Sequence, residues 1–307
     1  MIVTPESIAI GRGKSAAIKR QLWMRRLKFG KDELVYSPTH HGLPNQDGQI
    51  ITIHDMICLR FPRQHLSQYI FFRYFVPRLL SKCRAVFTVS ETSRRDIASS
   101  YGYALDRIHV VPNSVDTSRF TPGQVESRTP YLLMVGARYS HKNVDEVLRY
   151  AHLWKDKYRL VITSCSGRYR RVLERLIQRA GIGASVEFHD YISNEQLVRL
   201  YQGCMALIYP SKWEGFGIPP LEALACGRPV IVSDIEIHRE VLDEAAFFVK
   251  LGDEESWRKA LADLQDSARV NEVVAQGRGR LEYYTPDNSL RALEASLLAV
   301  EPALELA

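Results

Sequence analysis

The sequence is poor in cysteine and has no long apolar run. Its five cysteines, Cys58, Cys83, Cys165, Cys204 and Cys226, are dispersed and form no Cys-x-x-Cys pair. An odd, scattered set in apolar surroundings excludes a disulfide framework and a zinc cluster, and it indicates reduced thiols. No stretch approaches the ~18 consecutive apolar residues of a membrane span. The first residues also lack the basic head and apolar core of a signal peptide, so we expect a cytoplasmic protein.

Several motifs for phosphate, metal and nucleic-acid binding are missing. Gly13-Lys14-Ser15 matches the end of a P-loop, but Ile8 stands where that motif requires its first glycine. The chain has no Asp-x-Asp triplet, a common clamp for a metal-bound diphosphate. No nucleic-acid reader motif is recognisable. We therefore expect no metal or other cofactor and no nucleic-acid partner.

Positive charge is concentrated in the first part of the chain. Residues 1–122 contain 18 Lys and Arg against 9 Asp and Glu, a local net charge of +9, whereas the whole chain carries +6. No acidic residue lies between Asp55 and Glu91, and aromatic side chains alternate with arginines there. Such a surface suits an anionic membrane or a lipid-diphosphate acceptor, which would place the protein peripherally at the inner face of the cell membrane. The alternative is a solvated face over a packed aromatic core.

Short apolar strands alternate with helical patterns along the chain, which is typical of an α/β fold with parallel sheets. Two doubly wound, Rossmann-like domains facing a cleft are predicted, with a linker over residues 116–130. The first domain covers residues 1–122 and the second residues 123–286, and a last helix from about residue 287 to 307 packs back on the first. Predicted strands cover residues 34–37, 50–54, 85–90, 108–112, 131–135, 159–163, 186–189, 206–209, 229–233 and 246–249. Predicted helices cover residues 15–28, 66–82, 91–101, a stretch from 143, and residues 169–180, 194–203, 220–225, 254–266, 270–284 and 287–300.

The most informative segment is residues 211–231, in which Glu214 and Glu222 are separated by seven residues. Two glycines and a Pro-Pro pair lie between them, followed by a short helical run. A glycine turn exposes backbone N–H groups, and a helix that opens at a proline directs its positive end the same way, which suits phosphate. The two carboxylates can accept hydrogen bonds from hydroxyls. Phosphate and hydroxyls together describe a nucleotide-sugar; the alternative is a capping glutamate and a surface glutamate around a tight turn.

This block resembles the retaining GT-B glycosyltransferases of glycosyltransferase family 4, which include bacterial mannosyl- and glucosyltransferases. Lesser matches occur in the family's order between about residues 34 and 249. They are Thr52-Ile53-His54-Asp55, Thr88-Val89-Ser90-Glu91-Thr92-Ser93, Val111-Pro112-Asn113-Ser114-Val115-Asp116 and Val135-Gly136-Ala137-Arg138 with Lys142-Asn143. The resemblance implies a GT-B fold and a metal-independent hexosyltransferase that retains configuration.

The resemblance also assigns the donor-binding residues. Arg138 and Lys142 would hold the donor diphosphate and stabilise its charge as it leaves, in place of a metal ion. The backbone of Gly215, Phe216 and Gly217 would face the same phosphates. Separately, Glu214 would act at the transferred sugar, Glu222 would hold the ribose, and Tyr191 would meet the base.

In the first domain, His54 would lie near the transferred sugar and polarise or orient the reacting centre, and Asp55 would orient His54 or touch the acceptor. The expected acceptor is a lipid-linked saccharide or another surface-polysaccharide precursor. Only 53 residues precede His54, fewer than is usual in the family, so the first domain is expected to be abridged.

Several alternatives stay open. The donor is expected to be GDP-mannose, with a UDP-sugar as the alternative. A different class of function is a donor-binding but catalytically idle subunit that scaffolds another transferase. A sugar-nucleotide epimerase of the same fold is disfavoured by the two spaced glutamates.

Overall fold

The computed structural model describes residues 6, 19–20, 22–27, 29–30, 33–123 and 129–302. The helix predicted over residues 15–28 lies largely outside these residues. The chain divides into two compact units. The first comprises the residues up to Val89, Ser93–Val110 and those from Ser296 on; the second comprises Ser90–Thr92 and Val111–Ala295. Residues 111–122, predicted to belong to the first domain, thus group with the second unit.

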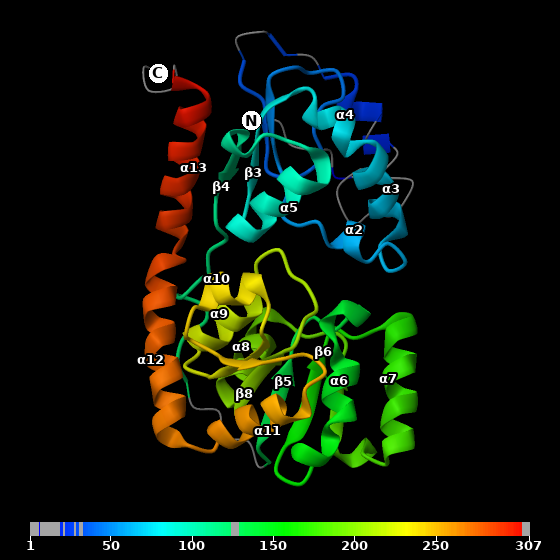
Figure 1. Cartoon of the computed structure of the whole chain (residues 1–307), viewed down its shortest axis with the longest axis vertical. Helices are drawn as coiled ribbons and strands as arrows, with labels where there is room; N and C mark the ends of the chain where they lie inside the picture. Colours follow the sequence, from blue (N-terminus) through cyan, green and yellow to red (C-terminus); the bar gives the residue numbers. More distant parts are fainter. Residues whose placement is uncertain are drawn as a thin grey trace. The chain divides into compact units, whose positions relative to one another are not determined.

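The first unit is built on a parallel four-stranded sheet in the order β1-β2-β3-β4. Its strands β3 and β4 are labelled in Figure 1. The strands are β1 (Tyr36–Ser37), β2 (Gln49–Thr52), β3 (Cys83–Thr88) and β4 (Ile108–Val110). The described helices are α2 (Ile57–Arg60), α3 (Leu66–Tyr74), α4 (Val76–Leu80) and α5 (Glu91–Tyr101), with a 3-10 turn, η2 (Leu105–Arg107). Ile51, Ile53, Phe72, Val86 and Ile97 are among the residues of its buried core.

The single helix predicted over residues 66–82 is wrong, because the structure contains two helices, α3 and α4, instead. Pro77 is the second residue of α4. A proline has no N–H to donate to the preceding turn and its ring clashes with that turn, so a continuous helix through this position is unfavourable. The segments on both sides of the break are helical, as their periodicity predicts, but they form two helices instead of one.

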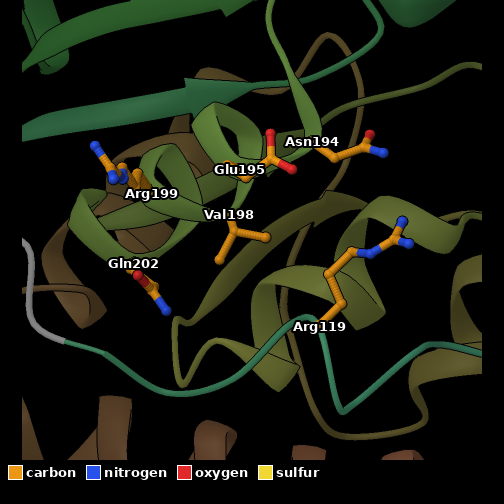
Figure 2. Close-up of a pocket in the computed structure, with 6 residues that line it drawn as sticks. All are labelled: Arg119, Asn194, Glu195, Val198, Arg199 and Gln202. Atoms are coloured by element: carbon orange, nitrogen blue, oxygen red, sulfur yellow. The ribbon is translucent and has the colours of Figure 1, made fainter.

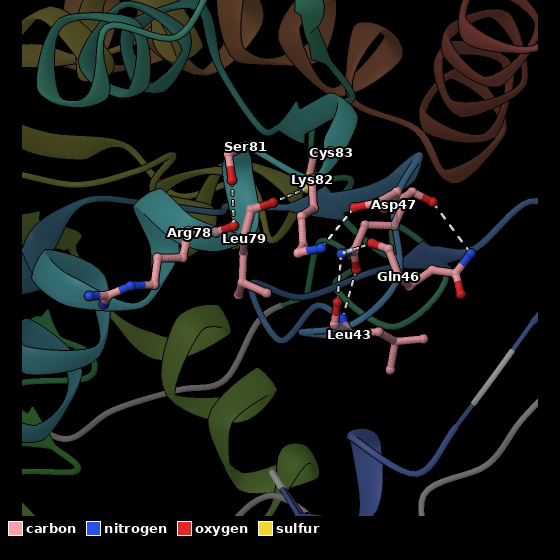
Figure 3. A network of polar contacts seen from close by, with 9 residues as sticks. Leu43, Gln46, Asp47, Arg78, Leu79, Ser81, Lys82 and Cys83 are labelled. Atoms are coloured by element: carbon pink, nitrogen blue, oxygen red, sulfur yellow. Dashed lines mark hydrogen bonds and ion pairs between the residues drawn. The ribbon is translucent and has the colours of Figure 1, made fainter.

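A hydrogen-bond network ties the loop before β2 to the end of α4 (Figure 3). The buried Gln49 amide accepts from the Leu43 N–H at 2.7 Å and donates to the carbonyls of Leu43 and Gln46, each at 2.8 Å. Lys82 donates to Asp47 at 2.8 Å. These bonds satisfy the backbone of a loop that the sheet alone would leave unpaired, and they fix the entry into β2.

The second unit contains a parallel six-stranded sheet in the order β10-β9-β8-β5-β6-β7. Its strands are β5 (Tyr131–Met134), β6 (Arg159–Thr163), β7 (Val186–His189), β8 (Ala206–Tyr209), β9 (Val230–Ser233) and β10 (Phe247–Val249). From β5 the chain runs outward through β6 to β7, and from β8 it runs outward the other way through β9 to β10. The order therefore reverses between β5 and β8, which is where open α/β sheets bind ligands, beyond the carboxyl ends of the strands.

The helices of the second unit follow the predicted pattern, with one omission. They are α6 (Val144–Arg149), α7 (Gly167–Ala180), α8 (Asn194–Gly203), α9 (Ile218–Ala225), α10 (Glu236–Leu242), α11 (Glu254–Asp263), α12 (Ser267–Tyr283) and α13 (Pro286–Val300), with the 3-10 turns η3 (Ser140–Lys142), η4 (Ala151–Leu153) and η5 (Gly183–Ser185). The sequence prediction missed α10, although its buried residues Ile237, Val241 and Leu242 recur at helical spacing. α12 packs closely on α9, and Gly277 permits this approach. A Cβ at Gly277 would lie only 2.7 Å from Leu224 Cδ2.

The observed architecture confirms the predicted α/β fold with parallel, Rossmann-like sheets in two units. In the described part of the first unit the strands follow chain order, and the second unit has the order reversal of a doubly wound sheet. The last helix, α13, runs into the first unit from Ser296 on, and Glu301 beyond it forms an ion pair with Arg84. None of the helices described is long and apolar enough to span a bilayer.

Candidate functional site

A glycine in a left-handed conformation shapes the turn before α9. Gly217 is the N-cap of α9, and its φ of +95° is a backbone conformation that residues other than glycine rarely adopt. Prolines occupy the first turn of α9, where their missing N–H costs nothing. Phe216 is buried and packs its ring against Tyr284, 5.1 Å between centroids, so only its backbone faces the turn. Within the second unit, the Ser90 hydroxyl also donates to the carbonyl of Gly215 at 2.8 Å.

A buried ion pair lies beside this turn. Lys142 Nζ donates to Glu214 Oε1 and to the Tyr209 hydroxyl, each at 2.7 Å. The Lys142 and Glu214 side chains are 17% and 8% exposed. Burial alone would raise the pKa of Glu214, but the adjacent Lys142 ammonium outweighs it and holds that pKa below its usual value. Burial alone would lower the pKa of Lys142, whereas Tyr209 and Glu214 raise it. Both groups are therefore charged at neutral pH.

The backbone that follows Lys142 is fixed by a second buried carboxylate. Asn143 adopts a left-handed conformation, φ 59°, and its side-chain amide donates to Glu146 Oε2 at 2.7 Å. Glu146 Oε1 accepts from the indole of Trp257 at 2.9 Å and from the N–H of Gly252 at 2.8 Å. This fully bonded carboxylate anchors η3 to the core, so the position of Lys142 does not depend on a mobile loop.

Arg138 stands apart from the ion pair. It follows β5 and the positive-φ Gly136, its side chain is exposed, and its guanidinium lies 5.7 Å from the centroid of the Tyr139 ring. An exposed, flexible arginine at a strand end can reach an incoming phosphate with two donors. Lys142 is thus a fixed cation of the site, whereas Arg138 is a solvated one.

Glu222 lies one turn inside α9 and is held by a different element. Its Oε2 accepts from the hydroxyl of Tyr201 of α8 at 2.7 Å. Burial raises the pKa of Glu222, against the lowering effects of Tyr201 and Arg119. Tyr201 is fully buried, with its ring 5.8 Å from that of Phe120. One oxygen of Glu222 is therefore fixed by the protein, which leaves Oε1 as the freer acceptor.

A pocket of about 320 Å³ lies along the outer side of α8 (Figure 2). None of the predicted site residues lines it. Its lining residues are Arg119, Asn194, Glu195, Val198, Arg199 and Gln202. Tyr191, predicted to meet the base, follows β7 and is 97% exposed. The structure thus gives Tyr191 the solvent access that base stacking needs, without a described partner ring to hold it.

In the first unit, His54 and Asp55 follow β2 at the carboxyl edge of the sheet. His54 Nε2 lies 3.0 Å from the carbonyl oxygen of Pro38. A carbonyl only accepts, so Nε2 carries a proton. Asp55 Oδ1 accepts from the N–H of Ile57 at 2.9 Å, at the start of α2. The backbone therefore orients His54, and Asp55 helps to begin a helix.

Comparison with known proteins decides the family. Residues 117–278, more than half of the chain, match the family described as Glycosyl transferases group 1, and residues 39–119 match Glycosyltransferase Family 4. The chain belongs to the group 1 glycosyltransferases. The predicted family resemblance is thereby confirmed.

Relatives along most of the chain support this membership. The glycosyltransferase is 34% identical over 288 residues to the O-antigen chain mannosyltransferase RfbU of Salmonella typhimurium, covering 90% of this chain and 80% of that one. It is 27% identical to O-antigen chain mannosyltransferase B of Escherichia coli, covering 88% and 74%.

Solved structures share its fold at low identity. A sucrose-phosphate synthase from Thermosynechococcus elongatus superposes with a TM-score of 0.70 at 19% identity, covering 86% of this chain and 72% of that one. WaaG, a glycosyltransferase involved in lipopolysaccharide biosynthesis, superposes with a TM-score of 0.66 at 14% identity, covering 94% and 82%. These likenesses confirm the predicted GT-B fold.

Sequence reasoning missed two histidines of the glycosyltransferase next to His54. His40 and His41 follow β1, and their rings lie 4.2 Å apart against Phe71 and Phe72. Burial lowers the pKa of His40 to about 3 and that of His41 to about 4, with smaller effects of neighbouring cationic groups. Because β1 and β2 are parallel neighbours, these side chains share an edge with His54. Their position just after the predicted strand 34–37 was the available signal.

His238 of the second unit was also missed. It lies on α10, is 1% exposed, and packs its ring 5.6 Å from that of Tyr209. Burial lowers the pKa of His238, and the charges of Glu214 and Lys142 act on it with smaller, opposite effects, so the ring lies within the field of the buried ion pair. The sequence prediction contained no helix at α10, so it gave no buried face to which His238 would belong.

Proposed function

We propose that this glycosyltransferase moves mannose from GDP-mannose to a lipid-linked or other surface-polysaccharide precursor, with retention of configuration and without a metal ion. The observation that carries the proposal is the buried Lys142–Glu214 pair beside the glycine turn at the start of α9. A fixed positive charge and the positive end of a helix at a sheet's order reversal suit a sugar-diphosphate. In this role Arg138 and Lys142 bind the diphosphate, Glu222 the ribose, and Tyr191 the base.

The state of the carboxylates supports retention without a covalent intermediate. Glu214 is bonded to Lys142 at 2.7 Å, and Glu222 to Tyr201 at 2.7 Å. A carboxylate held by a strong donor is a weak nucleophile, so neither is prepared to attack the sugar. The proposed reaction is a same-face displacement, in which the C–O bond to the diphosphate breaks, the acceptor oxygen bonds to the same carbon, and the departing phosphate takes the acceptor's proton.

Cationic side chains would do the work that a metal does in other transferases. The leaving diphosphate gains charge as its bond to the sugar breaks, and Lys142 and Arg138 stabilise that charge. The expected result is that a chelator such as EDTA leaves the transfer rate unchanged.

The proposed donor and acceptor rest on the names of relatives. Two of them are called O-antigen chain mannosyltransferases, and they match the chain over 90% and 88% of its length. His54 would orient the reacting centre, and Asp55 would orient His54 or act near the acceptor. The alternatives are a UDP-sugar donor and a donor-binding subunit without catalytic activity.

A binding and transfer experiment tests the proposal. The full chain is titrated with GDP-mannose, UDP-glucose and UDP-N-acetylglucosamine in a thermal-shift assay, and a donor present at 100 times its Kd should stabilise the protein by ~2.7 kcal/mol. Radiolabelled transfer to a glycolipid extract, with NMR of the product's anomeric centre, follows. If only a UDP-sugar stabilises the protein, the donor is a UDP-sugar and not GDP-mannose. Donor binding without sugar transfer would favour the catalytically inactive subunit. If no nucleotide-sugar binds, the proposed function is wrong.

We also propose that α3 and α4 dock on an anionic membrane. Leu66, Ile70 and Tyr74 recur every fourth residue on α3 and are 63%, 44% and 55% exposed. Arg63, Arg73 and Arg78 are exposed beside them, and in Figure 3 the Arg78 side chain points away from the other labelled residues. An exposed apolar stripe flanked by arginines, in a segment without acidic residues, is complementary to anionic lipid headgroups.

Replacing Arg63, Arg73 and Arg78 together by glutamine should reduce binding to vesicles of phosphatidylglycerol and phosphatidylethanolamine by roughly 100-fold, at about 1 kcal/mol for each arginine near the surface. Co-sedimentation measures the partition coefficient. The matched control replaces three exposed arginines of the second unit, Arg149, Arg168 and Arg171, and should bind as the parent does. The proposed docking surface would be contradicted if both variants lost vesicle binding equally. It would also be contradicted if vesicle binding did not depend on the presence of phosphatidylglycerol.

A further inference from the structure

One polar atom beside the proposed donor site has no described partner. His238 Nδ1 lies 2.9 Å from the carbonyl oxygen of Ser233, which can only accept, so Nδ1 carries the ring's proton. Nε2 of the neutral ring is then an acceptor. Among the residues that the structure describes, none donates a hydrogen bond to this buried atom. An unsatisfied buried acceptor is costly, and in native proteins it usually marks a strained or functional position.

The open nitrogen faces the glycine turn. A Cβ at Gly217 would lie 3.7 Å from His238 Cδ2 and 3.8 Å from Nε2. The same Cβ would lie 3.8 Å from Tyr209 Cε1, and Tyr209 in turn accepts from Lys142. Gly217 is the N-cap of α9. The imidazole edge therefore lies directly under the backbone that is proposed to receive the diphosphate.

The charges around this turn do not balance a nucleotide-sugar. Its diphosphate brings about two negative charges, and the α9 N-terminus offers only about half a positive charge. Of the two cations proposed to hold the diphosphate, Lys142 shares its charge with the Glu214 carboxylate, and Arg138 is exposed to solvent. Bringing a dianion to this turn therefore creates a negative field that one additional positive charge would offset. The open Nε2, 3.8 Å from the position of a Cβ at Gly217, is a group able to gain one.

We propose that His238 is a positioning residue of the donor site that takes up a proton at Nε2 when a nucleotide-sugar diphosphate binds at the Gly215-Phe216-Gly217 turn. The proton comes from solvent, an N–H bond forms at Nε2, and the proton returns to solvent when the diphosphate leaves. The Nε2–H of the imidazolium then donates toward the backbone of this turn and stabilises its conformation. The proposal rests on the proposed donor site, but not on the identity of the sugar or of the acceptor.

The surroundings of the ring keep it neutral until the ligand arrives. Burial, aided by Lys142, lowers the pKa of His238 to about 4, while the Ser233 carbonyl and Glu214 oppose the shift. The charged and titratable groups that act on the ring are thus Lys142 of η3, Glu214 before α9 and the nearby Tyr209 phenol of β8. Because the bound state holds the extra proton, donor binding should weaken as the pH rises from the free-state pKa of about 4 to the higher bound-state pKa, by up to about 10-fold per pH unit. Above the bound-state pKa neither state holds the proton, and Kd should no longer change with pH.

Calorimetry in buffers of different ionisation enthalpy measures the proton directly. GDP-mannose and UDP-glucose are the probes, because their diphosphate is a diester that does not itself titrate near neutral pH. The parent should take up as much as one proton per ligand at pH 6.5 to 7.5. His238→Asn, whose amide can still donate to the Ser233 carbonyl, should bind without uptake and lose the pH dependence of Kd. The control His152→Gln, exposed on η4, should behave as the parent does.

The outcomes separate two failures. If neither probe binds to the parent, the proposed donor site is wrong. If a probe binds with no proton uptake, or if uptake survives in His238→Asn and disappears in His141→Gln, the proposed role of His238 is overturned while the donor site stands. Should His238→Asn fail to fold, ¹⁵N NMR of histidine-labelled parent protein gives the same answer, because Nε2 must change from acceptor to protonated on addition of the probe.

Discussion

Replacing Lys142 with methionine is expected to lower kcat/KM for sugar transfer by about 10³-fold, the scale on which loss of one preorganised donor to a developing negative charge acts. The leaving diphosphate would lose its fixed cation. The same change should destabilise the protein by about 3–5 kcal/mol, because Glu214 would be left buried without a counter-charge. Steady-state kinetics and urea unfolding measure the two effects.

A second substitution separates stability from activity. Combining Lys142→Met with Glu214→Gln removes the uncompensated charge and should restore most of the lost free energy of unfolding. Transfer should remain impaired, because no cation is returned to the diphosphate. If the double variant recovers activity along with stability, the ion pair is only structural and the role proposed for Lys142 is wrong.

Replacing Glu222 with alanine is expected to raise the Kd of the donor by about 100-fold, since a carboxylate accepting from a hydroxyl contributes about 1.5–3 kcal/mol per hydrogen bond and the ribose offers two hydroxyls. Because ribose takes no part in bond breaking, kcat at saturating donor should change far less than KM. Isothermal titration with the intact donor and with its ribose-lacking sugar phosphate measures the difference.

Tyr201→Phe is the matched comparison for Glu222. It removes the 2.7 Å hydrogen bond to Oε2 but leaves the carboxylate and the buried ring in place. We expect a weaker effect, about 10-fold in Kd, because Glu222 would be less well oriented but still present. Equal donor affinity of Glu222→Ala and the parent would show that the carboxylate serves only to pair with Tyr201.

The proposed donor site could be put forward from the sequence because most of its residues are close together in the chain. Glu214 and the two glycines directly precede a helix that begins with prolines, and these residue types predict an anion-binding helix start. Lys142 was proposed from the family resemblance and from its place after a strand. What the residues could not reveal is that Lys142 and Glu214, assigned to different parts of the donor, bind each other at 2.7 Å. That pairing depends on the register of β5 against β8.

The missed features share a different physical cause. α10 contains charged residues at Glu236, Arg239 and Glu240, which obscure the apolar spacing of its buried face. His238 belongs to that face, so its burial under Gly217 is a consequence of packing between elements that a local pattern does not contain. The break at Pro77 has, in contrast, a local cause, because a proline within a helical pattern predicts that the helix ends or restarts there.

The Lys142–Glu214 contact also has a consequence for selectivity among the anions of a cell. Inorganic phosphate or a simple nucleotide reaching this turn must compete with a carboxylate tethered to the same chain, whose effective concentration is on the order of millimolar or more. A ligand that binds only through one phosphate gains too little to displace it. A nucleotide-sugar, anchored at several points at once, meets the same competitor with a much larger total binding energy. At the proposed donor site, competition from the enzyme's own carboxylate would therefore favour binding of a complete donor over binding of its fragments.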